Sequence, residues 1–178
     1  MDNAQGELYL TDVVELAAKR GKVINIEGDM SELTGINDRR ELALAAATRR
    51  RAIAEELARK GVGVVDLDTL YVDAECEIEP GAMLGANVHL RGRCIVRAGA
   101  QIDVGCVLID VVVEKDANVL PYTVATDSTI GEAAQVGPFS HLRPQSKLGP
   151  RSKVGNFSET KKTTLGEGSK VNHLSYVG

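Results

Sequence analysis

Two basic side chains occupy equivalent places in a repeating part of the sequence. Arg143 and Lys161 each follow the aliphatic residue of a six-residue repeat, and they are 18 positions apart. If three repeats form one coil, the two side chains stack at the same edge of neighbouring coils, where like charges cost about 0.2–1 kcal/mol. A phosphate between them would replace that cost with charge-assisted hydrogen bonds, whereas without an anion both would extend into water. The spacing therefore indicates a candidate phosphate site, and Lys162 adds positive charge beside it.

A histidine and a tyrosine lie further along the same basic stretch, at His173 and Tyr176. A histidine beside a phosphate site can act as a general base near neutral pH, and a tyrosine hydroxyl can donate to a phosphate oxygen. The alternative is that His173 is structural. His89 and His141 occupy the last position of their repeats, unlike His173, so the sequence does not support a three-histidine zinc site.

The residues that must position these groups form six-residue repeats between Val72 and Gly178. Each repeat begins with an aliphatic residue and carries a small residue four places later, as Ile130 and Ala134 do. This period is typical of a parallel β-helix. Three repeats would form a triangular coil of about 18 residues, with the aliphatic side chains pointing inward and stacking about 4.7 Å apart. Single-residue deletions at 108–113, near Ala125 and at 160–165 are expected at corners.

Cysteine and charge usage agree with this interpretation. Cys76, Cys94 and Cys106 fill the small position of their repeats, which predicts a structural role. Residues 61–135 contain four basic and twelve acidic side chains, whereas residues 136–178 contain seven basic and two acidic ones. The basic end is where we expect an anionic ligand; the alternative is a solvated surface with no partner.

The composition argues against two classes of partner. Aromatic residues make up 3% of the chain and are not interleaved with arginines, so no nucleic-acid partner is expected. The first residues lack the basic and apolar regions of a signal peptide, and the longest apolar stretch, 104–113, is interrupted by Asp110. We therefore expect a cytoplasmic protein with no membrane span.

The first part of the chain follows a different pattern. Asp12 to Lys19 predicts a short helix that starts at a capping box of Asp12 and Glu15. Residues 22–27 predict a strand. Such a short α/β segment makes a poor independent core, so we expect it to be the end of a larger α/β domain.

A longer helix is expected next. Asp38 and Glu41 have the capping-box spacing, and Gly61 is the expected stop. Because the repeats run to Gly178 with no capping element, we expect the chain to be truncated at both ends. The predicted segments are an α/β part at 1–37, a helical linker at 38–61, and an incomplete β-helix domain at 62–178.

Several strings in the sequence carry a family resemblance, and they occur in order along nearly the whole chain. They are Asn3–Asp12, Gly35–Arg39, Gly137–Pro144, Val154–Lys162 and Gly168–Gly178. The chain resembles the bacterial bifunctional N-acetylglucosamine-1-phosphate uridylyltransferase/glucosamine-1-phosphate N-acetyltransferase family. Such colinear strings are more specific than the six-residue repeat, which many acyltransferases share.

The resemblance implies that residues 1–37 are the C-terminal part of an α/β nucleotidyltransferase domain and that residues 62–178 belong to an acetyltransferase domain. This second domain would be a left-handed parallel β-helix that forms a homotrimer and acetylates glucosamine 1-phosphate with acetyl-CoA. Arg143 and Lys161 would bind the sugar phosphate, Tyr176 would assist, and His173 would deprotonate the attacking amine. The family's other domain joins the product to UTP with Mg²⁺ to form UDP-N-acetylglucosamine for peptidoglycan and lipopolysaccharide. Asn37 matches the family's asparagine that contacts the nucleotide sugar and helps to hold Mg²⁺; without the resemblance it would be a loop residue that caps a turn.

Three departures from the family pattern concern the site. Gln145 stands where glycine commonly follows Leu-Arg-Pro, and Ser158 and Thr160 replace aliphatic residues. The glutamine is expected to alter the turn that presents Arg143. The family's nucleotide-binding glycine-rich loop and metal-binding aspartate match nothing in this chain, so uridylyl transfer by this chain alone is not expected.

Three functional interpretations remain open from the sequence. The first is an enzyme segment that carries part of the acetyl-transfer site. The second is a non-catalytic trimeric β-helix scaffold whose cations are solvated. The third is a related sugar-phosphate nucleotidyltransferase with a regulatory β-helix, which would not need His173 near Arg143 and Lys161.

Overall fold

The computed structural model describes residues 11–28, 33 and 35–178, and the chain divides into two compact units, Met1–Asn37 and Asp38–Gly178. The string Asn3–Asp12 lies mostly outside the described residues. The functional assignment of the predicted segments 1–37, 38–61 and 62–178 remains a prediction.

The first unit contains one helix, α1 (Asp12–Arg20), among its described residues. This helix was expected, but its predicted capping box is wrong. Thr11 precedes the helix without a side-chain capping bond, and Asp12 already lies in the first turn. Glu15 instead accepts from Lys19 Nζ at 2.6 Å, four residues along the helix.

The predicted strand at 22–27 is also wrong. Residues 22–28 have no regular secondary structure and are exposed. A strand is stable only when a neighbouring strand completes its hydrogen bonds. No strand occurs among the described residues of this unit to provide such a ladder.

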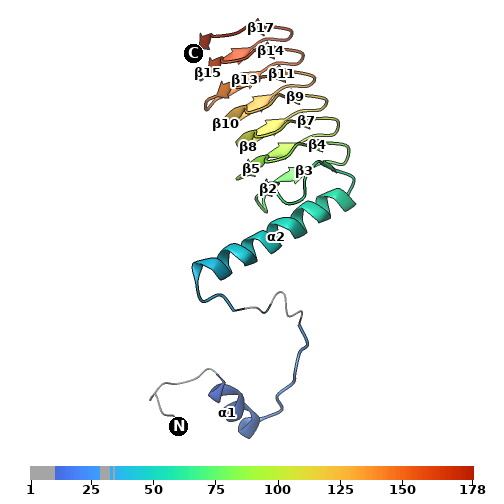
Figure 1. Ribbon diagram of the computed structural model, residues 1–178, viewed down its shortest axis with the longest axis vertical. Helices are drawn as coiled ribbons and strands as arrows, with labels where there is room; N and C mark the ends of the chain where they lie inside the picture. The colour runs from blue at the N-terminus through green and yellow to red at the C-terminus, as the bar shows by residue number, and fades with distance from the viewer. Residues whose placement is uncertain (1–10, 29–32, 34) are drawn as a thin grey trace. The chain divides into compact units, whose positions relative to one another are not determined.

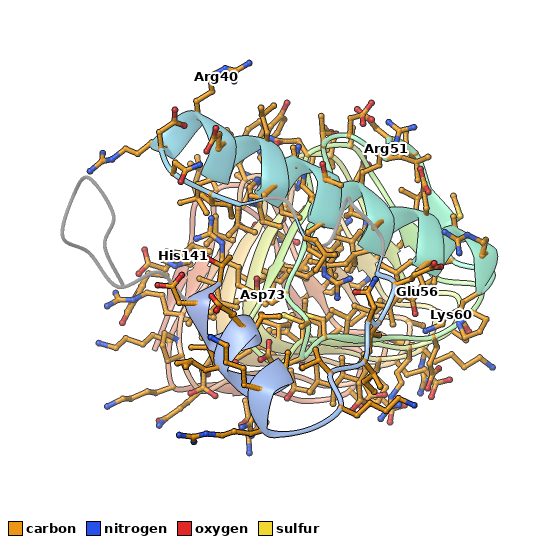
Figure 2. The ribbon with its side chains drawn as sticks, turned by 90° about the horizontal axis from the view of Figure 1, so that it is seen from below. Arg40, Arg51, Glu56, Lys60, Asp73 and His141 are labelled. Atoms are coloured by element: carbon orange, nitrogen blue, oxygen red, sulfur yellow. The ribbon has the colours of Figure 1, made fainter. Side chains whose placement is uncertain are left out.

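The second unit begins with α2 (Arg39–Arg59), which crosses the end of the β-helix (Figure 1). Asp38 Oδ1 accepts from the backbone N–H of Glu41 at 2.7 Å, as the capping spacing predicts, and Gly61 follows the helix with a φ of 93°. Figure 2 shows Arg51, Glu56 and Lys60 along this helix.

Contacts with the first coil hold α2 in place. Ala54 is fully buried, Arg51 forms an ion pair with Asp68, and Arg50 Cζ lies 4.6 Å from the centre of the Tyr71 ring. The helix therefore covers the open edge of the first coil.

The rest of the second unit is a solenoid of parallel strands with three faces. The first face consists of β1 (Gly63–Val64), β4 (Met83–Leu84), β7 (Gln101–Ile102), β9 (Asn118–Val119), β11 (Gln135–Val136), β14 (Lys153–Val154) and β17 (Lys170–Val171). The second face contains β2 (Tyr71–Val72), β5 (His89–Arg91), β12 (His141–Leu142), β15 (Glu159–Thr160) and β18 (Tyr176–Val177). The third face contains β3 (Glu77–Ile78), β6 (Ile95–Val96), β13 (Ser146–Leu148) and β16 (Thr164–Leu165). Two long strands, β8 (Val107–Val113) and β10 (Val124–Ile130), run from the second face onto the third.

The pairing register confirms the predicted deletions. Leu84 pairs with Ile102, 18 residues on, whereas Ile102 pairs with Val119, 17 residues on. The step returns to 18 between Val136 and Val154, and to 17 between Val154 and Val171. A coil thus loses one residue at a corner without changing which side chains point inward.

The inward positions form the core predicted from the repeats. The aliphatic residues from Leu84 to Val154 that the repeats place inward are no more than 2% exposed. Cys94 and Cys106 are buried free thiols in small positions, as expected, and burial raises the pKa of Cys106 to about 11. The expected fold class, a mainly β chain built as a parallel β-helix, is confirmed. No helix in the described part of the chain is long and apolar enough to cross a membrane.

Candidate functional site

The candidate phosphate pair lies at the corner between the second and third faces. Leu142 pairs with Thr160, and the backbone N–H of Arg143 donates to the Thr160 carbonyl at 2.8 Å. The next pair in this register is Arg143 and Lys161, so the two cations extend from neighbouring coils, as the 18-residue spacing predicts. Both side chains are partly exposed. This corner can therefore present two cations to one anion.

An acidic residue that the sequence analysis missed lies beside this pair. Glu159 Oε1 accepts from Arg143 Nη1 at 2.8 Å, and the two side chains are 39% and 38% exposed. The like-charge cost at this corner is thus offset without a ligand. An exposed ion pair of this kind contributes about 0–1 kcal/mol, so a phosphate with its greater charge can compete with Glu159 for the guanidinium.

The spacing of Glu159 contained a usable signal. It precedes Lys161 by two residues, so both side chains point outward from the same coil. Its strand neighbours are His141 on one side and Tyr176 on the other. Because Arg143 is the next outward residue after His141, this register places Glu159 diagonally beside Arg143.

Tyr176 joins the same group. It lies on the second face in the coil after Glu159 and is 63% exposed. Its hydroxyl is therefore available to a ligand that lies over this face. Arg143, Glu159, Lys161 and Tyr176 together form what we call the second-face cluster.

His173 lies at a different corner. It lines a hollow of about 360 Å³ between the first and second faces, together with Gln135, Lys153, Asn156 and Asn172. The structure therefore places His173 three residues from Tyr176 along the chain, but across the second face from Arg143 and Lys161. A ligand that uses all four groups must span the face.

Contacts with neighbouring residues fix the backbone around His173. Its carbonyl accepts from Ser175 Oγ at 2.9 Å, and the following residue, Leu174, has a φ of 50°. Gly155 lies under this segment, and a Cβ at that position would overlap the Asn172 carbonyl oxygen. A glycine is thus required for the last coil to approach the one before it.

Buried hydroxyls support the Arg143 corner from inside the solenoid. Thr160 is fully buried in an aliphatic position, and its Oγ1 donates to Ser146 Oγ at 2.9 Å. Ser146 Oγ in turn donates to the Arg143 carbonyl at 2.7 Å. The departure from the family pattern at Thr160 is therefore a satisfied polar contact that fixes the backbone of a site residue.

Gln145 follows Arg143 at the same corner with a φ of 65°. This left-handed conformation explains why glycine suits the position. Its coil equivalents Asp127 and Lys162 have φ values of 41° and 48°, so the corner keeps its shape in each coil. The expected alteration of the turn is therefore backbone strain at Gln145 and not a different turn.

Asn37, the predicted magnesium and nucleotide-sugar ligand, lies in the first unit and is exposed. Mg²⁺ needs several oxygen ligands in near-octahedral geometry, usually with carboxylates. Among the described residues, no group of three or more histidine, cysteine, aspartate or glutamate side chains is placed to hold a metal. The described part of the chain therefore does not fit a complete Mg²⁺ site.

Comparison with known proteins gives this geometry a context. No protein-family model matches the chain. The bifunctional protein GlmU of Sorangium cellulosum is 52% identical over 178 residues, and that of Thermobifida fusca is 46% identical over 179 residues. Both alignments cover 99% of this chain. The chain is related to the bifunctional GlmU proteins.

The chain matches only part of each of these GlmU relatives. The chain spans 37% of the length of each of the two. Among solved structures, the acetyltransferase domain of PglB from Neisseria gonorrhoeae, in complex with acetyl coenzyme A, has a TM-score of 0.58 at 17% identity. That similarity covers 74% of this chain and 63% of the PglB chain, and it shows the shared fold.

Proposed function

We propose that this chain carries part of the acetyl-transfer site of a bifunctional enzyme that acetylates glucosamine 1-phosphate with acetyl-CoA. The observation that carries the proposal is the placement of Arg143 and Lys161 in neighbouring coils, with Tyr176 on the same face. The relation to GlmU proteins and the acetyl coenzyme A complex of a protein with this fold support it.

The sugar phosphate would lie across the second face. Its phosphate would replace Glu159 on the Arg143 guanidinium and accept from Lys161, because planar guanidinium and ammonium groups both donate strongly to phosphate. The Tyr176 hydroxyl would donate to a remaining oxygen. The 2-amine of the sugar would then extend toward the His173 corner.

His173 would act as general base. A neutral imidazole takes one proton from the sugar amine as its nitrogen attacks the thioester carbonyl carbon of acetyl-CoA. The C–S bond breaks, and coenzyme A leaves with the thiolate, which needs one proton to become the thiol. The imidazolium can return that proton, so His173 ends each cycle neutral.

The whole enzyme would also transfer UMP from UTP to N-acetylglucosamine 1-phosphate in the cytoplasm, as a homotrimer that requires Mg²⁺. Asn37 would contact the UDP-N-acetylglucosamine product and Mg²⁺ in that reaction. Because the described residues do not complete a Mg²⁺ site, no step of uridylyl transfer is derived from this chain.

A hybrid protein tests the proposal. In it, these 178 residues replace the matching segment of the Sorangium cellulosum GlmU protein, and coenzyme A release and pyrophosphate release report the two reactions separately. His173→Ala should abolish acetyl transfer and leave uridylyl transfer intact. His89→Ala, a histidine that stacks on Tyr71 far from the cluster, is the control and should retain both. Retained acetyl transfer in His173→Ala, or parallel loss of both activities, would refute the assigned role.

A further inference from the structure

Two cysteines lie next to each other in the first two coils of the solenoid. Glu77 pairs with Ile95, and the backbone N–H of Glu77 donates to the Cys94 carbonyl at 2.8 Å. The preceding pair in this register is Cys76 and Cys94. Neighbouring strands lie about 4.7–4.9 Å apart, and disulfides join residues whose Cα atoms are about 4.4–6.8 Å apart. The spacing of the two backbones therefore suits a disulfide.

The two side chains also meet. They occupy the small inward position at the corner between the second and third faces, and this column continues through the buried residues Val111, Ser128 and Ser146. The thiols are in hydrogen-bond contact, which lowers the pKa of Cys94 to about 7 and raises the pKa of Cys76. Because the pair shares a proton, it offers a thiolate, the nucleophilic form of cysteine, near neutral pH.

The third cysteine of the chain has no such neighbour. Cys106 follows Cys94 by 12 residues and lies at another corner, directly before β8. Its Sγ donates to the Leu120 carbonyl at 3.1 Å, and burial raises the pKa of its thiol to about 11. A thiol of this kind is unreactive at neutral pH. The chain thus contains an internal comparison for the pair.

A hollow between α2 and the first coil gives access to the pair. It has a volume of about 270 Å³, and Cys76 lines it. Figure 2 labels three other lining residues, Glu56 and Lys60 of α2 and Asp73 of the first coil. Cys76 is partly exposed, whereas Cys94, in the next coil, is fully buried. A small solute in the hollow therefore reaches the sulfur of Cys76 first.

We propose that Cys76 and Cys94 form a redox modification site, at which a small peroxide that enters the hollow converts the two thiols into a disulfide between the first two coils. Redox-sensing cysteines share this arrangement: one thiol is accessible, the pair has thiolate character, and a second thiol lies next to the first to resolve it. Reversible disulfides of this kind occur even in reducing compartments, where permanent ones are rare. The site goes beyond the proposed acetyl transfer and does not depend on it.

The reaction with hydrogen peroxide has two steps. When the shared proton lies on Cys94, the Cys76 thiolate attacks one peroxide oxygen, the O–O bond breaks, hydroxide leaves, and Cys76 becomes a sulfenic acid. The Cys94 thiolate then attacks the sulfur of Cys76, the S–O bond breaks, and a second hydroxide leaves. The two protons released by the thiols convert both hydroxides into water. The two sulfurs together lose two electrons, which reduce the peroxide.

The disulfide would strengthen one end of the solenoid. The first coil pairs with a neighbouring coil on one side only, and α2 covers its other side. A bond between residues 18 positions apart removes conformations of the unfolded chain and holds the first coil to the second. Oxidation should therefore raise the melting temperature, and a small thiol should reverse the change by disulfide exchange.

Peroxide treatment of the reduced, folded chain tests the site. The free thiols are then counted with a maleimide in denaturant and located by mass spectrometry of peptides. One thiol of three, that of Cys106, should remain free, and Cys76 and Cys94 should be joined within one chain. The melting temperature should rise and return to its starting value after dithiothreitol. Three free thiols, a bond to Cys106, or a bond between two chains would overturn the proposal.

Single alanine variants test which sulfur meets the peroxide. Alanine suits these positions, because Ala82 and Ala100 fill the small position of other repeats and are fully buried. In Cys94→Ala, dimedone should trap a sulfenic acid on Cys76, and peroxide should not raise the melting temperature. In Cys76→Ala, the buried Cys94 should resist peroxide. Cys106→Ala is the matched control and should form the disulfide as the unmodified chain does. A sulfenic acid on Cys94 in Cys76→Ala, or a peroxide-dependent rise in the melting temperature of Cys94→Ala, would contradict the site.

Discussion

Two arginine–glutamate pairs link neighbouring coils of the solenoid with nearly the same geometry. Arg97 Nη1 lies 2.8 Å from Glu79 Oε1, and Arg143 Nη1 lies 2.8 Å from Glu159 Oε1. Their side chains are 38–41% exposed. Distance and exposure therefore do not distinguish the two pairs.

Their surroundings differ. Glu79 also accepts from the backbone N–H of Ala98 at 2.8 Å, and this bond, together with the guanidinium, lowers the pKa of the Glu79 carboxyl. For Glu159, the described residues provide no hydrogen-bond donor to its carboxylate other than Arg143, and Lys161 lies next to it in the same cluster. Both carboxylate oxygens of Glu79 thus accept hydrogen bonds. The Arg143–Glu159 pair instead has a second cation, Lys161, beside it. The comparison teaches that a structural clamp and a ligand site can share one motif.

Replacing the two arginines, one at a time, should give the largest difference between the two pairs. Arg143→Ala is expected to weaken binding of glucosamine 1-phosphate by about 1.5–3 kcal/mol, roughly 10- to 150-fold, because it removes a charged hydrogen-bond donor. Arg97→Ala is the matched control and should leave the affinity unchanged. Calorimetric titration measures both, and equal affinities for the two variants would reject the role of Arg143.

Removing the carboxylate that competes for Arg143 should strengthen ligand binding. Glu159→Gln frees Arg143 from an ion pair worth at most about 1 kcal/mol, so glucosamine 1-phosphate should bind up to several-fold more tightly. Glu79→Gln should have no effect on the same titration. Weaker binding by Glu159→Gln would mean that Glu159 contacts the ligand itself.

The Arg97–Glu79 pair should instead affect the stability of the folded chain. A carboxyl whose folded pKa is lowered adds stability above its unfolded pKa of about 4.3 and loses that contribution as the pH falls through the folded value. Glu79→Gln should therefore lower the melting temperature at pH 7, and the difference should shrink as the pH is lowered from 7 to 3. Thermal melts at both pH values check this. A deficit that persists in acid would assign the effect to packing.

The smallest expected effect concerns the corner that presents Arg143. Gln145→Gly relieves a left-handed non-glycine residue but makes the unfolded chain more flexible, so we expect a net gain of only about 0.5 kcal/mol. Chemical denaturation measures it. A clear loss of stability would show that the Gln145 side chain makes a stabilising contact at this corner.

The residues that face the interior of the β-helix could be predicted from the sequence. Residues such as Leu108 and Ile130 recur with one period because each must pack on its equivalent in the next coil, and even the deletions follow from that requirement. The adjacency of Arg143 and Lys161 followed from the same register. The strand expected at 22–27 failed because local pattern does not supply a pairing partner.

The outward half was less predictable. The place of Glu159 beside Arg143 depends on which residues each coil turns outward, and the repeat leaves the identity of those residues open. His173 was expected beside the phosphate pair, and the structure separates them across a face because position along the chain does not specify the corner. If the outward residues had been assigned to the three faces, the sequence would have predicted both the place of Glu159 and the separation of His173 from Arg143 and Lys161.

Chemical-shift mapping of the unmodified chain with glucosamine 1-phosphate tests the central claim most directly, with glucosamine as the control that lacks the phosphate. We predict saturable shifts at Arg143, Lys161 and Tyr176 with the phosphosugar and none with glucosamine. Absence of saturable shifts, or shifts confined to the early coils around Arg97, would contradict the assignment of the second-face cluster as a phosphosugar site.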